Sequence, residues 1–517
     1  MEKVYLEKFR EDLKEFHEMT EKFYKKEITV PQYKGFSGGF GSYAQRGGER
    51  SMLRLRLAGG EVDKDKLKFI VDSIKKYNID MAHLTTCQTI QLHNLTKETV
   101  CQLVEEAWEH GIITRGGGGD YPRNVMCSPL SGVNPEETFD VLPLAKEAGN
   151  YLLSFIGEVK LPRKLKVCFS NDRKNETHAT FRDMGFVAKE NGTFDVYIAG
   201  GLGIKPKFGV KVVEDLEPSK ILYCIKTMVD IFTKYGNYES RAASRTRFLQ
   251  DTLGVEELKR VFQERLSQNL GEEDLELNVD LGSFQPKKKG NTNKEAGLKH
   301  PRVIPQKQQG LYAVSYHPVG GTVAPDFFQQ LYKTIETMEE VKIRLTPGQG
   351  MYIINLTEEE AEEVLKITKE GAETVFERST ACIGADICQQ GIGLTQALLS
   401  ACVERVKKEN FADGVLPAIH ISGCPSSCAA HQTAAIGLRG GKKPSPEGPK
   451  FAFAVYENGC EFNGEERFGQ ELGVMYEEQI PEFFVELGHA VAAEGLIYEE
   501  FRKKYPERIV EIAGKYI

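Results

Sequence analysis

The chain has 517 residues, of which 40% are apolar and 27% charged, and these proportions predict about three globular domains. They exclude collagen-like, mucin-like and fully disordered proteins. The 67 lysines and arginines against 75 aspartates and glutamates give a formal charge of -8, so we expect no nucleic-acid partner. No stretch approaches the roughly 18 apolar residues of a membrane span, and the first eight residues lack an apolar signal core. We therefore expect a cytoplasmic protein with no membrane partner.

The chain opens with a charged amphipathic helix, predicted over residues 2–26, and a glycine-rich loop between Gly35 and Gly48. Cations of the first half then gather at predicted strand ends and in glycine-rich turns, not on helix faces. These cations are Arg46, Arg54, Arg56, Arg123, Arg163, Lys164 and Lys166. In a chain that is acidic overall, this placement indicates an anionic ligand.

An internal repeat occupies much of the chain. Shifting the sequence by 261 residues aligns 54–98 with 315–359 without a gap, and twelve positions are identical, including Gln88 and Gln349. Each copy predicts the same elements in the same order: a strand (52–57, 312–317), a Gly-Gly turn, an amphipathic helix (65–77, 326–338) and a strand (81–92, 341–354). The chain is therefore a duplicated α+β unit.

Each copy is followed by a predicted α/β segment that could carry a ligand. The first segment, 155–248, ends in a predicted helix that carries three arginines, and the second contains two pairs of cysteines. Between the copies, residues 285–301 are polar and basic with proline and glycine punctuation. They predict an exposed linker, with a docking surface for an acidic protein as the alternative.

Eleven cysteines in a chain without a signal peptide favour metal or redox chemistry over a disulfide framework. Four of them form two close pairs, Cys382 with Cys388 and Cys424 with Cys428. This C-x5-C and C-x3-C spacing fits neither zinc knuckles nor the common ferredoxin runs. Glycines near both pairs let the backbone approach inorganic sulfides, so a cuboidal cluster is favoured over four buried thiols.

Together, four motifs resemble the siroheme-containing sulfite and nitrite reductase family. They are the cysteine spacing, the turn at 420–428, the segment Arg123–Cys127 and the segment Leu161–Lys166. The likeness extends from Tyr43 to about Gly440 and includes the duplication. It implies an α+β fold of duplicated ferredoxin-like modules with pseudo-two-fold symmetry, plus two α/β domains that hold siroheme and a 4Fe-4S cluster, with siroheme between the modules.

The resemblance, combined with the repeat, gives expected domain boundaries. We expect an N-terminal helix and loop at 1–50, a first ferredoxin-like half-module at 51–135, a first siroheme-binding α/β domain at 136–280, a basic linker at 281–310, a second half-module at 311–370 and a second α/β domain with the cluster cysteines at 371–517.

The resemblance also implies the cofactor ligands. The 4Fe-4S cluster is expected on Cys382, Cys388, Cys424 and Cys428, and Cys428 is expected to bridge to the siroheme iron as well. Siroheme carries eight carboxylates, so basic and polar residues should bind it. Arg46 and Gln88 are the candidates.

Four cations match the family positions that surround the substrate anion: Arg56, Arg123, Lys164 and Lys166. The implied activity is the six-electron reduction of sulfite to sulfide, with nitrite to ammonia as the alternative. Each departing oxygen needs a charge-assisted donor and a proton. Arginine holds the anion, and a lysine with a depressed pKa can release the proton. The lysine at 166 favours the doubly charged sulfite over nitrite.

Two departures from the family pattern stand out. Cys87 occupies a position in Thr85–Gln88 where the family usually has an arginine, and His83 is the candidate replacement. Ser426 stands where the cluster turn commonly has asparagine. Neither change removes a cluster ligand, but both bear on substrate preference and reduction potential.

The electrons should come from outside the chain, because Gly200–Gly203 lacks the spacing of a dinucleotide-binding turn. Ferredoxin or a separate flavoprotein is the expected donor. Two alternatives of a different class are a cluster-only redox sensor or electron carrier and a zinc-stabilised binding protein. A cluster-only protein gives no role to the cations of the first half. The cysteine spacing disfavours a zinc-stabilised protein.

Overall fold

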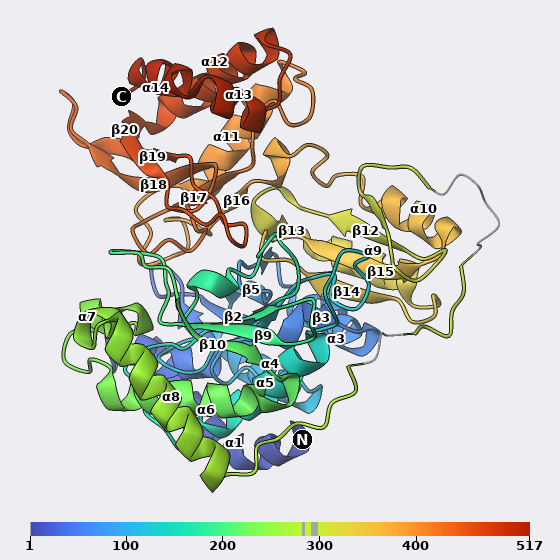
Figure 1. Cartoon of the computed structure of the whole chain (residues 1–517), viewed down its shortest axis with the longest axis vertical. Helices are drawn as coiled ribbons and strands as arrows, with labels where there is room; N and C mark the ends of the chain where they lie inside the picture. Colours follow the sequence, from blue (N-terminus) through green and yellow to red (C-terminus); the bar gives the residue numbers. More distant parts are fainter. Residues whose placement is uncertain (1, 282–284, 291–297) are drawn as a thin grey trace. The chain divides into compact units, whose positions relative to one another are not determined.

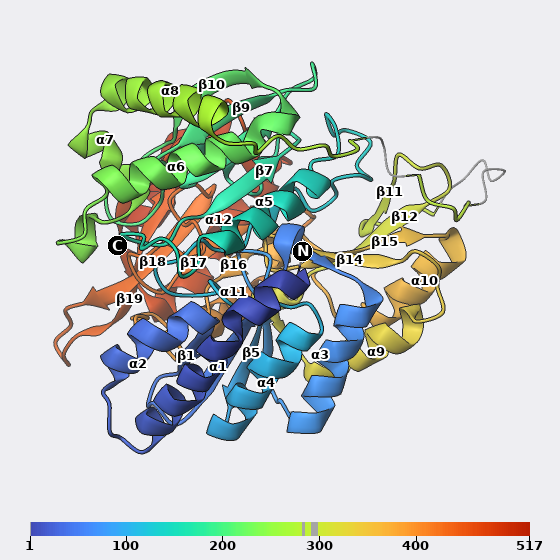
Figure 2. The same ribbon diagram turned by 90° about the horizontal axis from the view of Figure 1, so that it is seen from below.

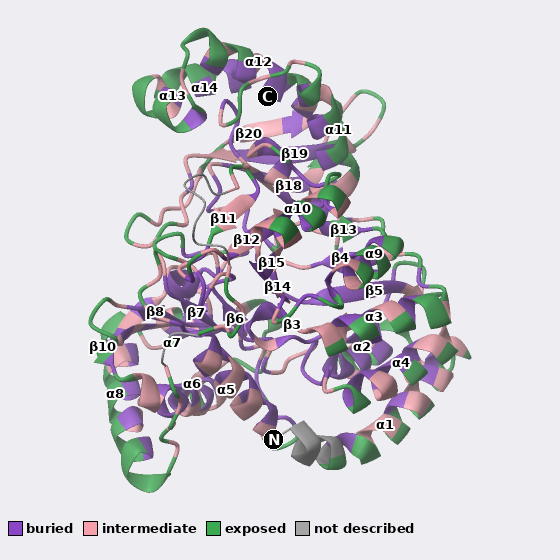
Figure 3. Ribbon diagram, turned by 90° about the vertical axis from the view of Figure 1, so that its right-hand side faces the viewer, coloured by how far each residue is buried: buried purple, intermediate pink, exposed green. Residues whose placement is uncertain are grey.

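The computed structural model describes residues 2–281, 285–290 and 298–517, and the chain divides into two compact units (Figure 1). Unit 1 comprises Met1–Gly201, Lys205–Ser315 and Val323–Lys369, and unit 2 comprises Leu202–Ile204, Tyr316–Thr322 and Glu370–Ile517. Buried residues run along the strands of each unit (Figure 3). Of the helices in the described residues, none is long and apolar enough to cross a bilayer.

The first ferredoxin-like module, residues 42–109, is built on a five-stranded sheet of order β1-β2-β5-β4-β13, in which β13 (Thr322–Val323) comes from the second copy. Its own strands are β1 (Ser42–Ala44), β2 (Ser51–Leu55), β4 (Ala82–Leu84) and β5 (Ile90–Leu95). The helices are α3 (Lys64–Tyr77) and α4 (Lys97–Glu109), each begun by a side chain that caps a backbone N–H. Helix α4 packs on β2, and α1 (Glu2–Tyr24) packs on α4 (Figure 2).

The second module, residues 303–367, repeats these elements 261 residues later, so the duplicated α+β fold is confirmed. Its sheet has the order β11-β12-β15-β14-β3. The elements are β11 (Val303–Pro305), β12 (Tyr312–Tyr316), α9 (Pro325–Ile335), β14 (Lys342–Leu345), β15 (Met351–Leu356) and α10 (Glu358–Ile367). Strand β11 lies inside the segment predicted as linker, since a three-residue strand leaves no periodic signal in the sequence.

Side-chain hydrogen bonds repeat with the elements. In the first copy the amide of Gln45 bonds Asn94, with Nε2 to Oδ1 at 2.9 Å and the Asn94 backbone N to Oε1 at 2.8 Å. In the second copy Gln306 makes the same two bonds to Asn355, at 3.0 and 2.7 Å. These pairs tie the first strand of each module to its central strand.

The two modules exchange strands. β3 (Glu61–Val62) belongs to the first copy but pairs with β14 of the second, and its counterpart β13 (Thr322–Val323) is the edge strand of the first sheet. Two equivalent glutamines form reciprocal hydrogen bonds between the modules. Gln88 Nε2 donates to Leu345 O at 2.7 Å, and its equivalent Gln349 donates to Leu84 O at 3.3 Å. This reciprocity confirms the pseudo-two-fold relation between the modules.

Each copy has a β-hairpin where one long strand was predicted, at 81–92 and at 341–354. The turns close with Thr85 N bonded to Thr89 O at 3.0 Å and Thr346 N bonded to Gly350 O at 2.9 Å. Gln88 and Gln349 take the left-handed conformation there, with φ of 53° and 67°. Glutamine is not a usual residue for that conformation, which is why the first turn is not visible in the sequence.

The first α/β domain, residues 126–272, lies in unit 1 except for Leu202–Ile204. Its sheet has the order β10-β9-β8-β7-β6, with parallel pairs at the β6 side and antiparallel pairs at the β10 side. The strands are β6 (Met126–Cys127), β7 (Val167–Ser170), β8 (Met184–Ala188), β9 (Phe194–Ile198) and β10 (Val210–Leu216). Helices α5 (Leu142–Ser154), α6 (Ile221–Tyr235) and α8 (Val255–Glu272) share its core.

The prediction of a helix at the end of this domain is wrong. Residues 241–248 form two 3-10 turns, Arg241–Ala243 and Thr246–Phe248. The hydroxyl of Ser244 donates to Arg241 O at 3.0 Å. Such local side-chain bonds compete with helix formation, and the irregular turns place the arginines in different directions.

The second α/β domain, residues 380–514, lies in unit 2 and has the same topology, which the sequence did not reveal. Its strands β16 (Thr380–Ala381), β17 (Ile419–Ser422), β18 (Ile436–Lys443), β19 (Lys450–Glu457) and β20 (Gln470–Tyr476) show the same succession of parallel and antiparallel pairs. Helices α11 (Thr395–Lys407), α12 (Ile480–Ala493) and α14 (Pro506–Gly514) complete it.

Part of the predicted linker is bound to the second module. The side chain of Lys288 is 8% exposed, and its ammonium donates to Glu339 O and Asn355 O at 3.1 and 3.0 Å and pairs with Glu360. This lysine therefore anchors the segment and is not part of a free basic surface. Residues 291–297 lie outside the described residues.

Candidate functional site

One face of the first module's sheet is polar although it is buried. Along β2 and β5, Leu53, Leu55, Ile90 and Leu92 take the apolar face, and Arg54 pairs in register with Gln91 on the other. The polar side chains that share this region are Arg54, Arg56, His83, Gln91 and His93. A buried polar face needs partners for its donors and acceptors, so it indicates a bound polar group.

Two histidines on this face are buried and uncharged. His83 and His93 are 2% and 1% exposed, and their rings lie 6.3 Å apart. Burial, followed by the neighbouring charge of Arg54, lowers the pKa of His93 to about 4; burial and His93 lower that of His83 to about 3. Among the described residues neither ring nitrogen of His93 has a hydrogen-bond partner. Orphaned nitrogens beside a cation fit the carboxylates of an anionic macrocycle.

This burial predicts a pH-dependent stability. His83 and His93 in unit 1, and His317 and His431 in unit 2, have pKa values lowered to about 3 or 4 from 6.5. Below pH 6.5 the unfolded chain binds protons that the folded chain does not, so the free energy of unfolding falls as the pH falls. The slope reaches about 1.4 kcal/mol per pH unit for each histidine.

Urea unfolding at pH 7.5, 6.5, 5.5 and 4.5 checks this expectation. His93→Leu removes one such proton site, so the loss between pH 6.5 and 4.5 should be smaller than in the parent. Stability that stayed constant or rose on acidification would contradict the assignment.

Arg56 and Arg123 are held by backbone carbonyls. The guanidinium of Arg56 donates to Arg115 O, Arg123 O and Gly149 O at 3.2 to 3.3 Å. Arg123 donates to Gly117 O at 2.9 Å and to Gly119 O at 3.2 and 3.3 Å. Burial, with Arg54 and Arg245, lowers the pKa of Arg123, while Tyr43 opposes the shift. The structure thus fixes both planar cations in place before any ligand binds.

Lys166 lies just before β7, half-buried, and its ammonium contacts a cysteine. Nζ is 3.3 Å from Cys87 Sγ, and the Lys166 backbone N donates to Asp183 Oδ2 at 2.9 Å. Asp183 is fully buried and also accepts from Arg245 Nη2 at 3.0 Å and from Thr246. The carboxylate of Asp183 therefore orients both Arg245 and the backbone at Lys166.

Several of these charges act on one another. Burial lowers the pKa of Lys166, Cys87 opposes that shift, and Arg182, Arg245 and Arg123 add to it. Arg182 donates to Thr177 O at 3.0 Å. We call Arg54, Arg123, Lys166, Arg182 and Arg245 the cation cluster; all of them lie in unit 1. Five cations around the thiol of Cys87 and the carboxylate of Asp183 make a setting for a small anion.

The predicted substrate cations are therefore partly brought together. Arg56 contacts the backbone of Arg123, and Arg123 acts electrostatically on Lys166. Lys164 is half-buried two residues before Lys166. Their assignment as substrate ligands stays a prediction. Arg182, Arg245 and Asp183 were not predicted, because Arg245 lies 62 residues beyond Asp183 in the chain and none of the three carries a motif.

The two predicted siroheme ligands differ in setting. Arg46 is exposed in the loop between β1 and β2. Gln88 is fully buried, and besides Leu345 O its amide donates to Cys127 O at 2.8 Å while its Oε1 accepts from Cys127 N at 2.9 Å. The amide of Gln88 thus joins the two modules and the first α/β domain. The cofactor role of both residues stays a prediction.

The four predicted cluster cysteines lie in two loops of unit 2. Cys382 follows β16 directly, and Cys424 follows β17 after one residue. Cys382 Sγ accepts the N–H of Gly423 at 3.1 Å. Cys428 is exposed and the other three are half-buried. Burial, then the charge of Cys428, raises the pKa of Cys382 to about 12, so this thiol stays protonated unless an electropositive metal cluster binds it.

Glycines make room beside these cysteines. A Cβ on Gly423 would lie 3.1 Å from Gly393 O and 3.6 Å from Cys382 Sγ, and one on Gly440 would lie 2.7 Å from Gly423 O. Backbone N–H groups can therefore approach the sulfur atoms closely, as an iron-sulfur cluster requires. In the described part of the chain no three histidine, cysteine or acidic side chains converge as ligands of a single ion. A cuboidal cluster holds its four thiolates further apart than one ion does.

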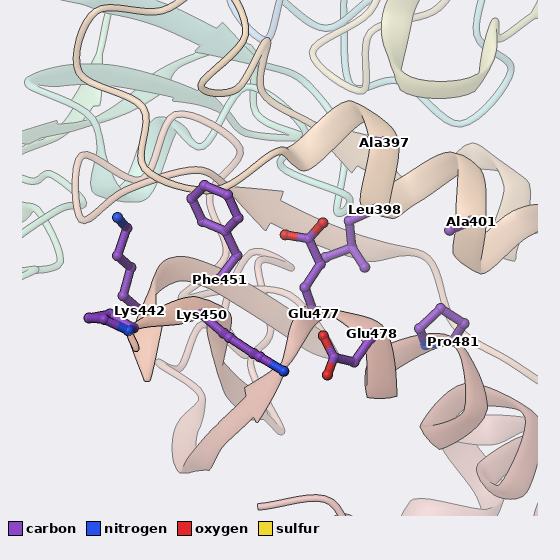
Figure 4. A pocket seen from close by; sticks show the side chains of 10 residues that line it. Ala397, Leu398, Ala401, Lys442, Lys450, Phe451, Glu477, Glu478 and Pro481 are labelled. Atoms are coloured by element: carbon purple, nitrogen blue, oxygen red, sulfur yellow. The ribbon is translucent and has the colours of Figure 1, made fainter. Parts of the chain in front are cut away.

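Unit 2 also contains a hollow of about 580 Å³ between α11 and the β18–β19 hairpin (Figure 4). Lys442, Lys450, Phe451, Glu477 and Glu478 line it. Burial raises the pKa of Glu477, and Glu478 and Asp386 add to the shift. The charges of the lining balance, and no predicted site residue takes part, so this hollow does not fit an anion.

Comparison with known proteins gives consistent matches. The family model described as the nitrite and sulphite reductase 4Fe-4S domain matches residues 118–270, and the nitrite/sulfite reductase ferredoxin-like half domain matches 43–109 and 304–371. The two half-domain matches coincide with the two modules. The 4Fe-4S model matches the first α/β domain, whereas the four cysteines lie in the second, which has the same topology.

The similar proteins include both nitrite reductases and sulfite reductases. The chain is 26% identical over 421 residues to the chloroplastic ferredoxin–nitrite reductase of Spinacia oleracea, covering 76% of this chain and 66% of that protein. It is 25% identical over 405 residues to sulfite reductase [ferredoxin] 1 of Mycolicibacterium paratuberculosis, covering 75% and 69%. The solved structure of NirA from Mycobacterium tuberculosis matches with a TM-score of 0.75 at 21% identity, covering 92% of this chain and 89% of that one, which supports the fold.

Proposed function

The chain belongs to the nitrite and sulfite reductase family, and on that basis we propose that it reduces sulfite to sulfide in a six-electron reaction. The observation that carries the proposal is the cation cluster, in which Arg123 and Lys166 are fixed beside a buried polar sheet face. A redox protein that held only an iron-sulfur cluster would have no use for this arrangement.

The residues present fit the two cofactors of the family, siroheme and a 4Fe-4S cluster. The cluster would be held by Cys382, Cys388, Cys424 and Cys428, beside the glycines that admit the backbone. Siroheme carboxylates would be met by Arg46 and by the polar face of the first module, where the ring nitrogens of His93 have no partner among the residues that the structure describes. When bound, the coupled cofactors supply the electrons and an iron that takes the anion.

The cations of the chain bind the anion and deliver protons. Arg56 and Arg123 cannot lose their charge near neutral pH, so they hold the oxygens of the substrate. Lys166 has a lowered pKa because of burial, and it can therefore give a proton to an oxygen that departs as water. Lys164 adds a second ammonium to the same segment.

A second substrate, nitrite, is favoured by one observation. Cys87 contacts the ammonium of Lys166, and an anionic thiol offsets part of the charge that attracts a doubly charged anion. Singly charged nitrite loses less from that offset than sulfite does. We propose sulfite as the first substrate on the ground of the lysine itself.

The electrons are proposed to come from ferredoxin or a separate flavoprotein. The spinach and mycobacterial relatives are named as ferredoxin-dependent enzymes. Turnover supported by reduced ferredoxin, compared with turnover supported by a flavoprotein reductase, decides between the two donors.

The deciding experiment is an anaerobic absorption spectrum followed by turnover with each anion under a low-potential reductant. Macrocycle bands that respond to sulfite, with release of sulfide, support the proposal. If the bands responded to nitrite alone and only nitrite were turned over, the substrate would be nitrite and not sulfite. If protein expressed with adequate siroheme supply showed an iron-sulfur shoulder without macrocycle bands, the proposed enzyme would be wrong, and the chain would be a cluster-only redox protein.

Exchange of Lys166 for asparagine tests the substrate argument. Lys166→Asn should lower the ratio of kcat/KM for sulfite over nitrite by about tenfold or more, since each unit charge near 4 Å is worth up to about 4 kcal/mol at an effective dielectric constant of 20. Lys160→Asn, at an exposed position in the same segment, is the control. An unchanged ratio in Lys166→Asn would remove the ground for preferring sulfite.

A further inference from the structure

Cys87 occupies an unusual position among the cysteines, because its thiol lies within the cation cluster. Sγ is 3.3 Å from Lys166 Nζ, and Arg54 and Arg182 also act on it. The residue is half-buried in the hairpin turn between β4 and β5. Its backbone is fixed on both sides, with Cys87 N donating to Thr85 Oγ1 at 3.3 Å and Cys87 O accepting from Asn124 Nδ2 at 3.0 Å.

From the side of Lys166 the contact is equally specific. Within the described residues, Cys87 Sγ is the single hydrogen-bond partner of the Lys166 ammonium. The cations that act on Lys166 are Arg123, Arg182 and Arg245, and the carboxylate of Asp183 acts on it as well. Asp183 accepts a hydrogen bond from the Lys166 backbone and forms an ion pair with Arg245, so its negative charge is already balanced by the guanidinium of Arg245. Cys87 is thus the group that can balance the ammonium of Lys166.

We propose that Cys87 is a thiolate positioning residue, which holds the side chain of Lys166 in place and keeps it protonated among three arginines. The two residues form a thiolate–ammonium pair, and the pair, not the lysine alone, sets the proton supply of the anion site. Its effect on turnover rests on the proposed function, whereas the pair itself does not.

The charges around the thiol support this state. Burial alone would raise the pKa of Cys87, but Lys166, Arg182 and Arg54 outweigh burial and lower it to about 6. Cys101, in α4 of the same module, is also half-buried, but Glu105 and Glu98 oppose the one lysine, Lys97, that acts on it. Burial raises its pKa to about 11. The chain therefore offers a matched thiol for comparison.

The pair can be tested without turnover by alkylation of the purified holoenzyme with iodoacetamide from pH 5 to 9, read residue by residue by mass spectrometry. Because the thiolate is the reactive form, the rate at Cys87 should reach half its maximum near pH 6, and Cys101 should react only at the alkaline end. In Lys166→Met the midpoint for Cys87 should move up by one pH unit or more, and Lys166→Arg should keep it low.

A Cys87 midpoint above pH 8, no Cys87 adduct below pH 8, or an unchanged midpoint in Lys166→Met would each overturn the pair. These outcomes leave the proposed function intact. Low-pH labelling of Cys87 in a protein that reduces neither sulfite nor nitrite would instead support the pair and overturn the proposed function.

The effect on catalysis is read from the pH profile. In Cys87→Ala the ammonium of Lys166 loses its hydrogen-bonded thiolate, and Asp183, already paired with Arg245, is the anion that remains. The ammonium should therefore lose its proton at lower pH, and the alkaline limb of kcat/KM should move down by one pH unit or more. In a Lys166→Arg background the same change should not move the limb, because a guanidinium stays charged without a counter-ion. Superimposable profiles of the parent and Cys87→Ala would overturn the positioning role.

Discussion

Cys428→Ser should abolish the 4Fe-4S cluster and lower turnover with sulfite and nitrite by about 1,000-fold or more, a loss of about 4 kcal/mol or more in transition-state stabilisation. A serine oxygen is a harder and far less acidic ligand than a thiolate, and Cys428 is the residue expected to join the cluster to siroheme. It is also the exposed member of the four, so the change leaves no cavity in the core of unit 2. The effect should be on the cofactor and not on folding.

Cys460→Ser is the matched control, since Cys460 is a half-buried free cysteine of the same unit outside the two cysteine loops. It should keep the cluster spectrum and the rate. Iron and sulfide analysis, the absorption near 400 nm and the far-ultraviolet circular dichroism of both variants separate cluster loss from unfolding. A Cys428→Ser protein that kept the four cluster irons in addition to the siroheme iron, with normal turnover, would refute the ligand assignment.

The modules were predictable because glycines and glutamines recur with a constant spacing. Gly59 and Gly320 both have φ near +67°, a left-handed conformation that glycine adopts at the lowest cost, so this identity survives in both copies. The exchange of β3 and β13 was not predictable. A two-residue strand has no periodicity, and its partner is chosen by tertiary contacts such as the ion pair of Glu61 with Arg344 at 3.0 Å.

The second duplication escaped sequence comparison because only its backbone is retained. Asn175 and Ser427, 252 residues apart, both have positive φ, and so do His178 and Ala430. A Cβ on Gly185 or on its equivalent Gly437 would lie within 2 Å of the carbonyl at the same place in each loop. The loops have the same path but different side chains. The second carries Cys424 and Cys428, and the first carries polar residues at those places.

The candidate site was predicted where motifs exist and missed where geometry alone assembles it. Arg123 and Lys166 stand in recognisable segments, whereas Arg182 and Arg245 enter through an irregular loop and a 3-10 turn. The residue that holds Arg245 and the Lys166 backbone is Asp183, in the first position before β8. A single buried aspartate in an apolar segment gives no functional signal until its partners are known.

Asp183→Asn should therefore have the largest effect in unit 1. The carboxylate accepts from both Arg245 and the Lys166 backbone, and an amide leaves the half-buried guanidinium without a counter-ion. Loss of one partner of a buried ion pair costs about 3–5 kcal/mol of stability. Because misplacing catalytic groups by about 1 Å costs about 100-fold in rate, kcat/KM for either anion should fall by at least that factor.

The matched control is Asp195→Asn on β9 of the same sheet, whose carboxylate pairs with Lys189 and Lys211 at 3.4 and 3.3 Å, away from the cation cluster. It should cost less than about 1 kcal/mol and leave kcat/KM unchanged. Urea unfolding and steady-state kinetics measure both variants, and the cluster spectrum should persist in each, because the cysteines belong to unit 2. If Asp183→Asn kept parental stability and kinetics, Asp183 would not organise the cations, and the anion site would have to be sought elsewhere in unit 1.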